Sequence, residues 1–465
     1  MTSKVTREAS SFRDPNGHLF FKDGVLYRGV HSSYTADYEF LESSGLLEAL
    51  LDKKLLIPHE DVSDVMASEA GFSKVLKPEM IPFISYPYEW SFSQLKDAAL
   101  LTLEVQSLAL TKGMILKDAS AYNIQFHQGS PIFIDTLSFE RYEEGLPWDG
   151  YKQFCQHFLA PLALMSHCDI SLNKLMSSFI DGIPLDLASK LLPWKTKFSP
   201  HLGVHIHLHA KSQSKHAASS DGQKTSTLKR TQLDYLISGL TLGVNQLTWK
   251  GGGTEWADYY EETHNYSDEG MAHKYSLVKE LIEEISPQTV WDLGANDGRF
   301  SRLAAEFGAF TLSLDGDPSC VEANYLQTRA QKTTNLVPLL QDLTNPSANI
   351  GWSNAERKSL AARGGADLVL SLGLIHHLVI SNNTPFVMVA QFFAQICDAL
   401  LIEFVPKEDS QVQLLLQSRE DIFGTYEIES FRKEFAVYFE EQRSIKINST
   451  QRTLFYLTKK TPNNA

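Results

Sequence analysis

Short apolar runs alternate with longer amphipathic stretches through the second half of the chain. Runs of about five apolar residues favour buried strands, and stretches with apolar residues every three or four positions favour helices. The expected strands are Thr289–Leu293, Phe310–Leu314, Leu336–Leu340, Ala366–Leu372 and Ala399–Val405, and the expected helices are Arg299–Phe307, Pro318–Lys332 and Pro385–Asp398. This alternation predicts a parallel sheet covered by helices.

A different pattern follows near the C-terminus. The run Gln413–Leu416 indicates one more helix, and two alternating runs, Arg443–Ile447 and Arg452–Thr458, are joined by the turn-forming residues Asn448–Thr450. Alternation of this kind predicts an antiparallel hairpin. The fold class expected for this half is therefore α/β, with an open, mostly parallel sheet that ends in an antiparallel hairpin.

A polar stretch between His209 and Gln232, rich in Ser, Thr, Lys, Gln and Gly, separates the two halves. Such a segment buries too little apolar surface to offset the entropy of ordering it. We therefore expect an N-terminal domain of residues 1–210, a flexible linker of residues 211–231 and a C-terminal domain of residues 232–465.

The composition excludes several classes of protein. With 465 residues, of which 43% are apolar, the chain has enough apolar side chains for more than one core. The net charge of −14 at pH 7 argues against broad nucleic-acid binding, which needs a basic surface. The four cysteines form no C-x-x-C pair, and no apolar run is long enough to cross a membrane. We therefore expect a cytoplasmic protein with no membrane partner and no resident metal.

The stretch Val290–Arg302, VWDLGANDGRFSR, carries the clearest chemical signal. An apolar strand contains Asp292 near its end, and the glycine-rich turn Gly294–Gly298 leads into a helix. Ligands of open α/β sheets bind at this edge, and glycine allows close approach of the backbone. The turn does not match the dinucleotide fingerprint, because Asn296 and Arg299 stand where glycine is needed.

This stretch resembles the first motif of class I S-adenosylmethionine-dependent methyltransferases. Further segments that resemble motifs of that family follow the second, third and fourth expected strands. The resemblance implies a Rossmann-like fold that binds S-adenosylmethionine. The cofactor-binding residues that it implies are Asp292, Gly294, Ala295, Asn296, Gly298, Asp315, Asp317, Asp342, Leu343, Ser371 and Gly373.

The resemblance also implies how these residues share the cofactor. Asp292 and the turn Gly294–Gly298 would hold the methionine end. Asp315 or Asp317 would accept hydrogen bonds from the ribose hydroxyls, and Asp342–Leu343 would bind the adenine edge. An alternative stays open, since either Asp315 or Asp317 also suits the cap of the helix that follows.

Two adjacent histidines, His376 and His377, follow the fourth strand. A neutral imidazole there can accept a proton from a methyl acceptor, so both are candidate catalytic residues, although neighbouring side chains diverge and at most one would face the donor. The alternative is that one histidine packs beneath the loop while the other forms a hydrogen bond with the backbone. The motifs of adenine amino and cytosine C5 methyltransferases are absent, which favours a small-molecule or protein acceptor over a nucleic acid.

Two segments are candidates for the acceptor pocket. The connection Thr344–Gly365 is long, and long connections are often functional. The segments Trp256–Tyr260 and His264–Tyr266 gather aromatic and polar side chains before the first strand of this half. Ordinary surface packing is the alternative for all of them.

The chain also resembles a bacterial group of methyltransferase-like proteins that includes nodulation-associated proteins. The segments that carry this resemblance are Asn345–Ser347, Gly351–Trp352, Glu356–Arg357, His376–His377 and Glu403–Lys407. The group is mostly named from its cofactor motif, so it implies a methyltransferase and leaves the acceptor unidentified.

The N-terminal half carries a second signature. Asp118 precedes Asn123 by five positions, and Asp135 follows twelve positions later. This spacing resembles the catalytic loop and metal-binding aspartate of protein-kinase-like and aminoglycoside-phosphotransferase-like folds. The resemblance implies an α+β kinase-like domain in which these residues would serve ATP and magnesium.

Departures from that pattern are substantial. Leu116 replaces the usual His, no Gly completes the motif at Asp135, and no glycine-rich loop or lysine motif precedes it. The nearest substitute for the lysine is Arg28, in the hairpin-like segment His18–Val30. We therefore expect a degenerate kinase-like domain with little or no phosphotransfer. Active ATP- and magnesium-dependent chemistry and simple loop-capping roles are the alternatives.

Histidines alternate along His201–His209. Alternating histidines can bind a metal, but no acidic or Cys partner lies nearby in the sequence, so we expect an exposed strand face. Taken together, the patterns predict a methyltransferase that uses S-adenosylmethionine and acts on an unidentified small molecule or protein. The alternatives are a bifunctional protein with a phosphotransferase-like domain and a scaffold that binds the cofactor without catalysis.

Overall fold

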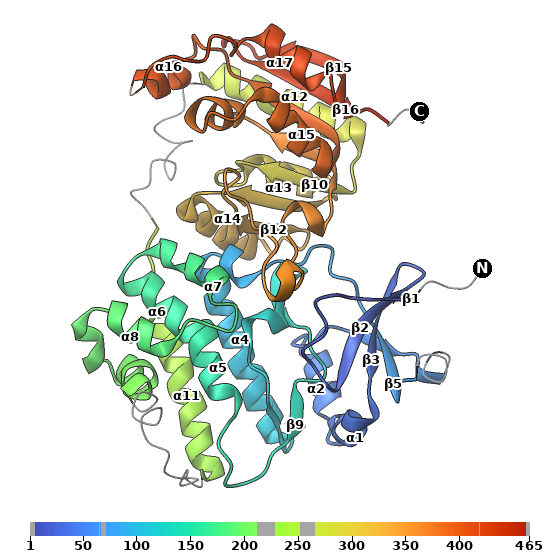
Figure 1. Ribbon diagram of the computed structural model, residues 1–465, viewed down its shortest axis with the longest axis vertical. Helices are drawn as coiled ribbons and strands as arrows, with labels where there is room; N and C mark the ends of the chain where they lie inside the picture. Colours follow the sequence, from blue (N-terminus) through green and yellow to red (C-terminus); the bar gives the residue numbers. More distant parts are fainter. Residues whose placement is uncertain are drawn as a thin grey trace. The chain divides into compact units, whose positions relative to one another are not determined.

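The chain forms two compact units in the computed structural model, which describes residues 5–64, 66, 71–211, 228–251, 266–417 and 419–461 (Figure 1). The first unit consists of Met1–Lys250 and Asn349–Arg357, and the second unit consists of Gly251–Ala348 and Lys358–Ala465. The central part of the predicted linker, residues 212–227, lies outside the described residues.

A seven-stranded sheet forms the centre of the second unit. Its first five strands are parallel, and the last two form an antiparallel hairpin. Across the sheet the strands are β12 (Leu336–Leu340), β11 (Phe310–Asp315), β10 (Thr289–Leu293), β13 (Ala366–Ser371), β14 (Cys397–Phe404), β16 (Thr453–Lys459) and β15 (Phe439–Lys446). This order confirms the mostly parallel sheet with a terminal antiparallel hairpin that the sequence predicts.

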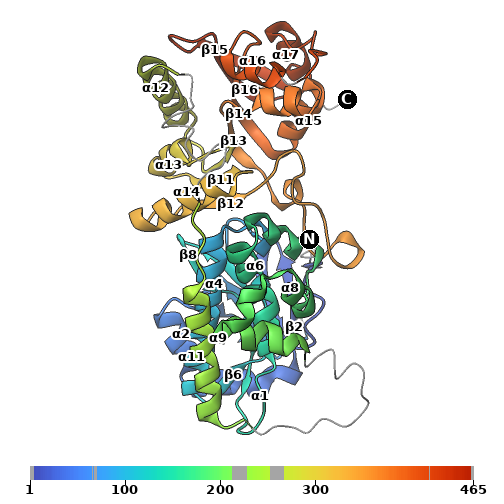
Figure 2. The ribbon, with the colours of Figure 1, turned by 90° about the vertical axis from the view of Figure 1, so that its left-hand side faces the viewer.

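Helices cover both faces of this sheet. In Figure 2, α12 and α13 lie on one side of it and α15 and α17 on the other. The helices of this unit are α12 (Asp268–Ile285), α13 (Arg299–Glu306), α14 (Pro318–Gln331), α15 (Phe386–Ile396), α16 (Ser410–Gln417) and α17 (Ile428–Phe435). The stripe Val278, Leu281 and Ile282 on α12 packs in the core with Val290 and Leu368. Burial of each such side chain contributes about 1.5–3 kcal/mol, which holds α12 on the sheet.

The first unit begins with a five-stranded antiparallel sheet. Across the sheet the strands are β1 (Val5–Arg7), β2 (Gly17–Lys22), β3 (Val25–Val30), β5 (Lys74–Pro78) and β4 (His59–Asp61). Two helices, α1 (Thr35–Ser43) and α2 (Leu46–Asp52), lie between β3 and β4 in the chain. The predicted hairpin His18–Val30 is thus confirmed as β2 and β3.

A helical part with two small sheets follows. The helix α4 (Phe92–Thr111) is buried on most of its surface, and Ser91 and Gln94 close its N-terminus with a capping box. The strands pair as β6 (Met114–Leu116) with β9 (Phe139–Arg141) and β7 (Ile124–His127) with β8 (Ser130–Phe133). The other α-helices are α5 (Gly150–Phe154), α6 (Ala160–His167), α7 (Leu175–Ser178), α8 (Leu185–Leu191), α9 (Pro200–Leu202) and α11 (Arg230–Gln246).

The observed boundary between the two units differs from the expected one at helix α11. The sequence places residues 232–250 in the C-terminal domain, whereas the structure includes them in the first unit. Lys96 on α4 donates hydrogen bonds to the carbonyls of Asn245 (2.9 Å) and Leu247 (2.8 Å), at the end of α11. These contacts and the apolar face of α11 hold the helix against α4.

The prediction of a strand for His201–His209 is wrong, because the segment is helical through α9 and the π-helix η7 (Gly203–Leu208). His201, His205 and His209 are four positions apart, so the alternation also fits one helical face. His205 Nδ1 lies 2.8 Å from the Tyr151 hydroxyl, and His207 lies between the hydroxyls of Ser189 and Thr196. His205 and His207 therefore have hydroxyl partners.

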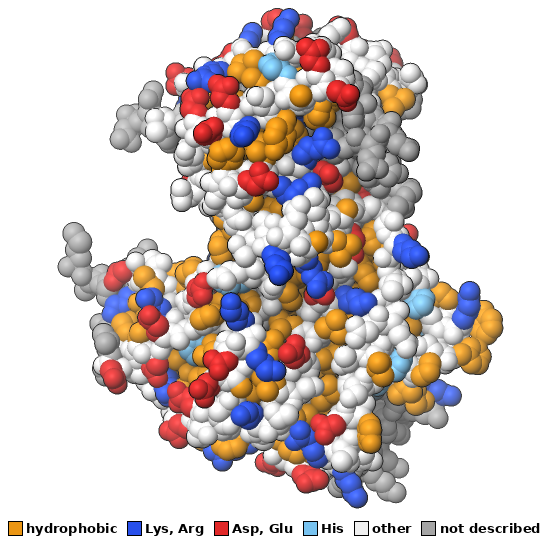
Figure 3. Space-filling view, turned by 180° about the vertical axis from the view of Figure 1, so that it is seen from behind, with side chains coloured by type: hydrophobic (Ala, Val, Ile, Leu, Met, Phe, Trp, Pro, Cys, Tyr) orange, Lys and Arg blue, Asp and Glu red, His pale blue; other side chains and the backbone are white. Residues whose placement is uncertain are grey.

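Charged side chains of both signs are interspersed on the face of the molecule seen in Figure 3. Among the described helices, none combines the length and the apolar composition needed to cross a lipid bilayer. Within the same residues, no group of three or more His, Cys, Asp and Glu side chains is arranged to hold a metal ion.

Candidate functional sites

The glycine-rich turn of the second unit connects β10 to α13. Gly294 and Gly298 have φ values of +73° and +81°, and Asn296 has a φ of +52°. A side chain at position 298 would be strained by the positive φ and crowded, because a Cβ there would lie 2.3 Å from the side-chain nitrogen Nδ2 of Asn324. The N–H groups of Gly294 and Ala295 donate to the carbonyl of Leu314 at 2.9 and 3.1 Å, which fixes the turn against the end of β11.

Asp292 lies beneath this turn and is 2% exposed. Its Oδ2 accepts a hydrogen bond from the Ser301 hydroxyl at 2.6 Å. Burial raises the pKa of Asp292 to about 7, with a further contribution from the negative charge of Asp315, whereas Ser301 and Lys274 act in the opposite direction. The carboxyl group of Asp292 therefore changes its charge near neutral pH.

Asp315 is the last residue of β11 and faces the turn. Its Oδ2 accepts from the N–H of Asn296 at 2.7 Å, and its Oδ1 accepts from the N–H of Asp317 at 2.8 Å. Burial raises the pKa of Asp315 to about 6, although these backbone donors favour the carboxylate. Each carboxylate oxygen has a further lone pair, so Asp315 can accept two more hydrogen bonds.

Asp317 has a different environment. It is the N-cap residue of α14, and its side chain accepts from the N–H of Ser319 at 2.7 Å. The capping role that the sequence left open for either aspartate thus belongs to Asp317, while Asp315 faces the glycine-rich turn.

The predicted adenine-edge residues follow β12, next to the end of β11. The N–H of Gln341 donates to the carbonyl of Asp315 at 2.7 Å, which joins the two strand ends. Asp342 is exposed, and its Oδ1 accepts from the N–H and the hydroxyl of Thr344 at 2.9 and 2.6 Å. Leu343 is half-buried beside it.

The end of β13 and the loop after it carry two buried polar atoms that have no hydrogen-bond partner among the described residues. They are the hydroxyl of Ser371 and Nδ1 of His376. Ser371 is fully buried, and His376 is 3% exposed. The rings of His376 and His377 lie 4.1 Å apart, and Gly373 between Ser371 and His376 has a φ of +80°. Burial lowers the pKa of His376 well below its usual range and that of His377 to about 4, so both imidazoles are neutral at physiological pH.

An ionic network that the sequence did not reveal lies beside this loop, and we call it the buried ion cluster. It consists of Tyr266, Lys274, Glu403, Asp409 and Arg452. Lys274 Nζ lies 2.6 Å from Glu403 Oε2, and Arg452 Nη1 lies 3.2 Å from Glu403 Oε1. Arg452 also forms a bidentate pair with Asp409 at 2.7 and 3.0 Å, and the Tyr266 hydroxyl donates to Glu403.

The buried ion cluster is electrically balanced, with two cations and two carboxylates. Burial alone would raise the pKa of Glu403, but Lys274 and Arg452 lower it to about 2. A Cβ at Gly373 would lie 3.8 Å from Glu403 Oε2, which places the cluster next to the loop after β13. Tyr266 belongs to one of the predicted acceptor-pocket segments and is buried here, while Trp256–Tyr260 and His264–Asn265 lie outside the described residues.

The other predicted acceptor-pocket segment, Thr344–Gly365, is divided between the units, because Asn349–Arg357 belongs to the first unit. Glu356 is buried there and accepts two hydrogen bonds from Arg13, at 2.5 and 3.0 Å. The guanidinium of Arg357 lies 4.2 Å from the ring centre of Tyr122. These contacts hold the segment Asn349–Arg357 within the first unit.

Asp118, Asn123 and Asp135 lie in two neighbouring loops of the first unit. The Asn123 amide donates to the Ser138 hydroxyl at 3.2 Å, and this hydroxyl donates to Asp135 Oδ2 at 2.6 Å. Asp118 Oδ1 accepts from the N–H of Ser120 at 3.0 Å. Burial and the charge of Asp135 raise the pKa of Asp118. The structure therefore brings the three predicted residues together.

Arg28 also reaches this group of residues. Its Nη2 lies 2.6 Å from Asp14 Oδ2 and 2.9 Å from Asp135 Oδ1. Arg28 is on β3, so the contact joins the antiparallel sheet to the loop before β9. In this structure the guanidinium that the sequence suggested as the nearest substitute for the lysine is paired with two carboxylates.

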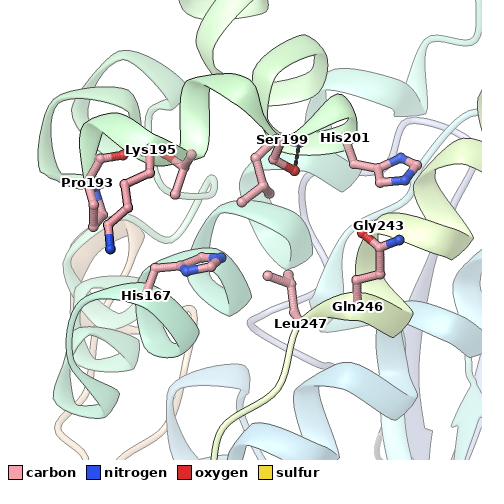
Figure 4. Close-up of a pocket in the computed structure, with 10 residues that line it drawn as sticks. His167, Pro193, Lys195, Ser199, His201, Gly243, Gln246 and Leu247 are labelled. Atoms are coloured by element: carbon pink, nitrogen blue, oxygen red, sulfur yellow. Dashed lines mark hydrogen bonds between the residues drawn. The ribbon is translucent and has the colours of Figure 1, made fainter.

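A pocket of about 400 Å³ lies elsewhere in the first unit, between the 3₁₀ helix η6 (Trp194–Phe198), α9 and α11 (Figure 4). His167, Lys195 and Gln246 contribute polar groups to its wall. None of the residues predicted to bind the cofactor lines this pocket.

No family model matches the chain. The nodulation protein NoeA of Rhizobium meliloti (strain 1021) is 36% identical over 465 residues, which cover 97% of this chain and 95% of that protein. This match confirms the resemblance to a nodulation-associated group.

Two solved structures are similar at a lower level. The magnesium protoporphyrin IX methyltransferase ChlM of Synechocystis PCC 6803, with bound SAH, is 16% identical over 44% of this chain and 98% of that chain, with a TM-score of 0.30. The bifunctional kinase-methyltransferase WbdD is 15% identical over 42% of this chain and 40% of that chain, also with a TM-score of 0.30. At these TM-scores neither similarity supports a functional argument.

Proposed function

The chain belongs to the NoeA family, and from this premise we propose that its second unit is an S-adenosylmethionine-dependent methyltransferase. The observation that carries the proposal is the order of the strands. The four segments expected to bind the cofactor follow β12, β11, β10 and β13, which are neighbouring parallel strands. Their carboxyl ends therefore meet at one edge of the sheet, where ligands of open α/β sheets bind.

The residues at this edge fit the cofactor. The positive φ values at Gly294, Asn296 and Gly298 leave backbone open toward a ligand, and the unpartnered hydroxyl of Ser371 is a hydrogen-bonding group in need of a partner. We assign Asp292 and the turn to the methionine end of the cofactor. When bound, S-adenosylmethionine would supply a methyl group activated by its sulfonium.

The remaining cofactor contacts follow from the aspartates. Asp315 retains two lone pairs that can accept from the ribose hydroxyls, and it is held in place by two backbone donors. Asp342 and the N–H of Leu343 are assigned to the adenine edge. Since Asp317 caps α14, we assign it a structural role.

We propose His376 or His377 as the group that accepts a proton from the methyl acceptor. Both are neutral at physiological pH, as a proton acceptor must be. The acceptor that we propose is a small molecule or a protein, because the chain has a net charge of −14 and lacks the nucleobase-methylation motifs.

Calorimetric titration of the full chain with S-adenosylmethionine tests the proposal. We expect saturable binding that Asp315→Ala weakens strongly and that Asp398→Asn, on an exposed position of β14, leaves unchanged. Absence of binding by the wild type, or equal binding by Asp315→Ala, would contradict it. Cofactor binding without any methylated product in an untargeted comparison of cells with and without the protein would favour the scaffold alternative.

For the first unit we propose a kinase-like fold without phosphotransfer. Asp118, Asn123 and Asp135 are assembled as the kinase-like resemblance implies, which supports the fold, but both carboxylate oxygens of Asp135 are engaged within the protein. Titration with ATP and magnesium is the test. Saturable binding that is lost in Asp135→Ala would instead support a bifunctional protein.

A further inference from the structure

The kinase-like resemblance of the first unit implies a magnesium ion held by Asn123 and Asp135. The residues present do not fit such an ion. Magnesium is bound by oxygen ligands in an octahedral arrangement, and it needs carboxylate oxygens that are free to coordinate. A cationic side chain, Arg28, lies against Asp135 instead.

Every carboxylate oxygen next to Arg28 already accepts a hydrogen bond. Asp14 Oδ2 accepts from Arg28 Nη2, and Asp14 Oδ1 accepts from the N–H of Asn16 at 2.8 Å. Asp135 Oδ1 accepts from Arg28 Nη2 and from the N–H of Leu137 at 3.3 Å, while Asp135 Oδ2 accepts from Ser138. Arg28 thus compensates one of these two negative charges, and hydrogen bonds from the protein orient both carboxylates.

The amide of Asn123 is engaged in the same network. Its nitrogen donates to the Ser138 hydroxyl, which in turn donates to Asp135. A magnesium ion between Asn123 and Asp135 would have to compete with Ser138 for Asp135 Oδ2 and approach within a few ångströms of the guanidinium, where like charges repel.

We infer that Arg28 is a built-in cation that replaces the metal ion of this site, so that the first unit is organised without magnesium. The inference rests on the kinase-like fold proposed for this unit and is independent of the methyltransferase proposal. Arg28 is held on β3, between Leu19 on β2 and Leu76 on β5, and its side chain is 12% exposed. The position of the charge is therefore set by the sheet and does not depend on a mobile loop.

Removal of the charge should turn the site into a cation site. Arg28→Met leaves Asp14 and Asp135 uncompensated, next to Asp118 and the amide of Asn123. An opposite charge at this distance changes the proton affinity of a carboxylate by about 10- to 1,000-fold. We expect Arg28→Met to increase the affinity of the full chain for Mn²⁺ by at least about tenfold on the same grounds.

The experiment is a titration of the full-length protein with Mn²⁺ alone, in which electron paramagnetic resonance reports the free ion. Arg28→Met is compared with the wild type, with Arg28→Met/Asp135→Asn, and with Arg141→Met, which removes an exposed positive charge from the same unit. We expect a gain in Arg28→Met, its loss in the double variant and no gain in Arg141→Met. If Arg28→Met does not fold, Arg28→Gln keeps a donor to the carboxylates and removes only the charge.

Two results would overturn the inference. One is a folded Arg28→Met or Arg28→Gln variant without a gain in Mn²⁺ affinity, which would leave the proposal of an inert kinase-like unit intact. The other is saturable Mn²⁺ binding by the wild type that Asp135→Asn abolishes, which would contradict both the inference and the inert unit.

Discussion

The two units each assemble aspartates that the sequence singles out, yet these aspartates have different partners. In the second unit, Asp315 accepts from backbone N–H groups and keeps lone pairs available, and the buried hydroxyl of Ser371 has no partner among the residues that the structure describes. In the first unit, Asp135 instead accepts from two side chains, the Arg28 cation on Oδ1 and the Ser138 hydroxyl on Oδ2. The difference teaches that a motif indicates ligand chemistry only when no side chain of the protein already stands in the place of the ligand.

The largest expected effect concerns the buried ion cluster that supports the loop after β13. Glu403→Gln leaves Lys274 and Arg452 without their shared carboxylate in a fully buried position. Breaking a buried pair in this way costs about 3–5 kcal/mol of unfolding free energy. Urea unfolding measures the loss, with Glu440→Gln on an exposed strand position as the control. A loss no larger than that of the control would show that the cluster does not stabilise the second unit.

The next effect distinguishes the aspartates of the two units directly. Asp315→Asn removes the charged acceptor proposed for two ribose hydroxyls, and hydrogen bonds to charged groups contribute about 1.5–3 kcal/mol each. We expect at least about 100-fold weaker binding of S-adenosylmethionine, since each 1.4 kcal/mol corresponds to tenfold. Asp135→Asn in the first unit should leave this affinity unchanged. Calorimetric titration of both variants with S-adenosylmethionine checks this difference. Equal losses of affinity in the two variants would contradict it.

The elements of the second unit could be predicted well from the sequence, because short apolar runs and the residues that flank them define its strands. The strands β10 and β12 begin and end where apolar runs meet polar or glycine residues, so their bounds agree with the expected ones. The helical form of His201–His209 was missed because histidines four positions apart satisfy both a strand and a helix period.

Local sequence patterns could not predict which residues pair when they lie far apart in the chain. Arg28 and Asp135 are 107 positions apart, and Glu403 and Tyr266 are 137 positions apart, so no spacing rule connects them. The only indication in the sequence was chemical, since charged residues such as Glu403 stand inside apolar runs and need a buried partner. The placement of α11 was missed for a similar reason, because an amphipathic face does not specify which unit it packs against.

A smaller effect is expected from pH. The pKa of Asp315 is raised to about 6 and that of Asp292 to about 7, and cofactor binding requires both carboxylates in their charged forms. Affinity for S-adenosylmethionine should therefore fall as pH decreases, by about 20-fold between pH 8 and pH 6. Asp315→Asn should give a shallower profile, because it removes one of the two titrating groups. A wild-type affinity that is constant over this range would argue against a charged role for either aspartate.

The smallest effect should come from Asp135→Asn on the stability of the first unit. Arg28 keeps Asp14 as a partner at 2.6 Å, and both side chains of the Arg28–Asp135 pair retain some exposure to solvent, at 12% and 21%. Partly exposed pairs contribute about 1 kcal/mol or less, so the unfolding free energy should change by about this amount. Because an asparagine can still accept from Ser138, the loop before β9 should keep its conformation. If denaturant unfolding instead shows a loss as large as that of Glu403→Gln, the Arg28 site is an essential structural element and its carboxylates are as tightly coupled as those of the buried ion cluster.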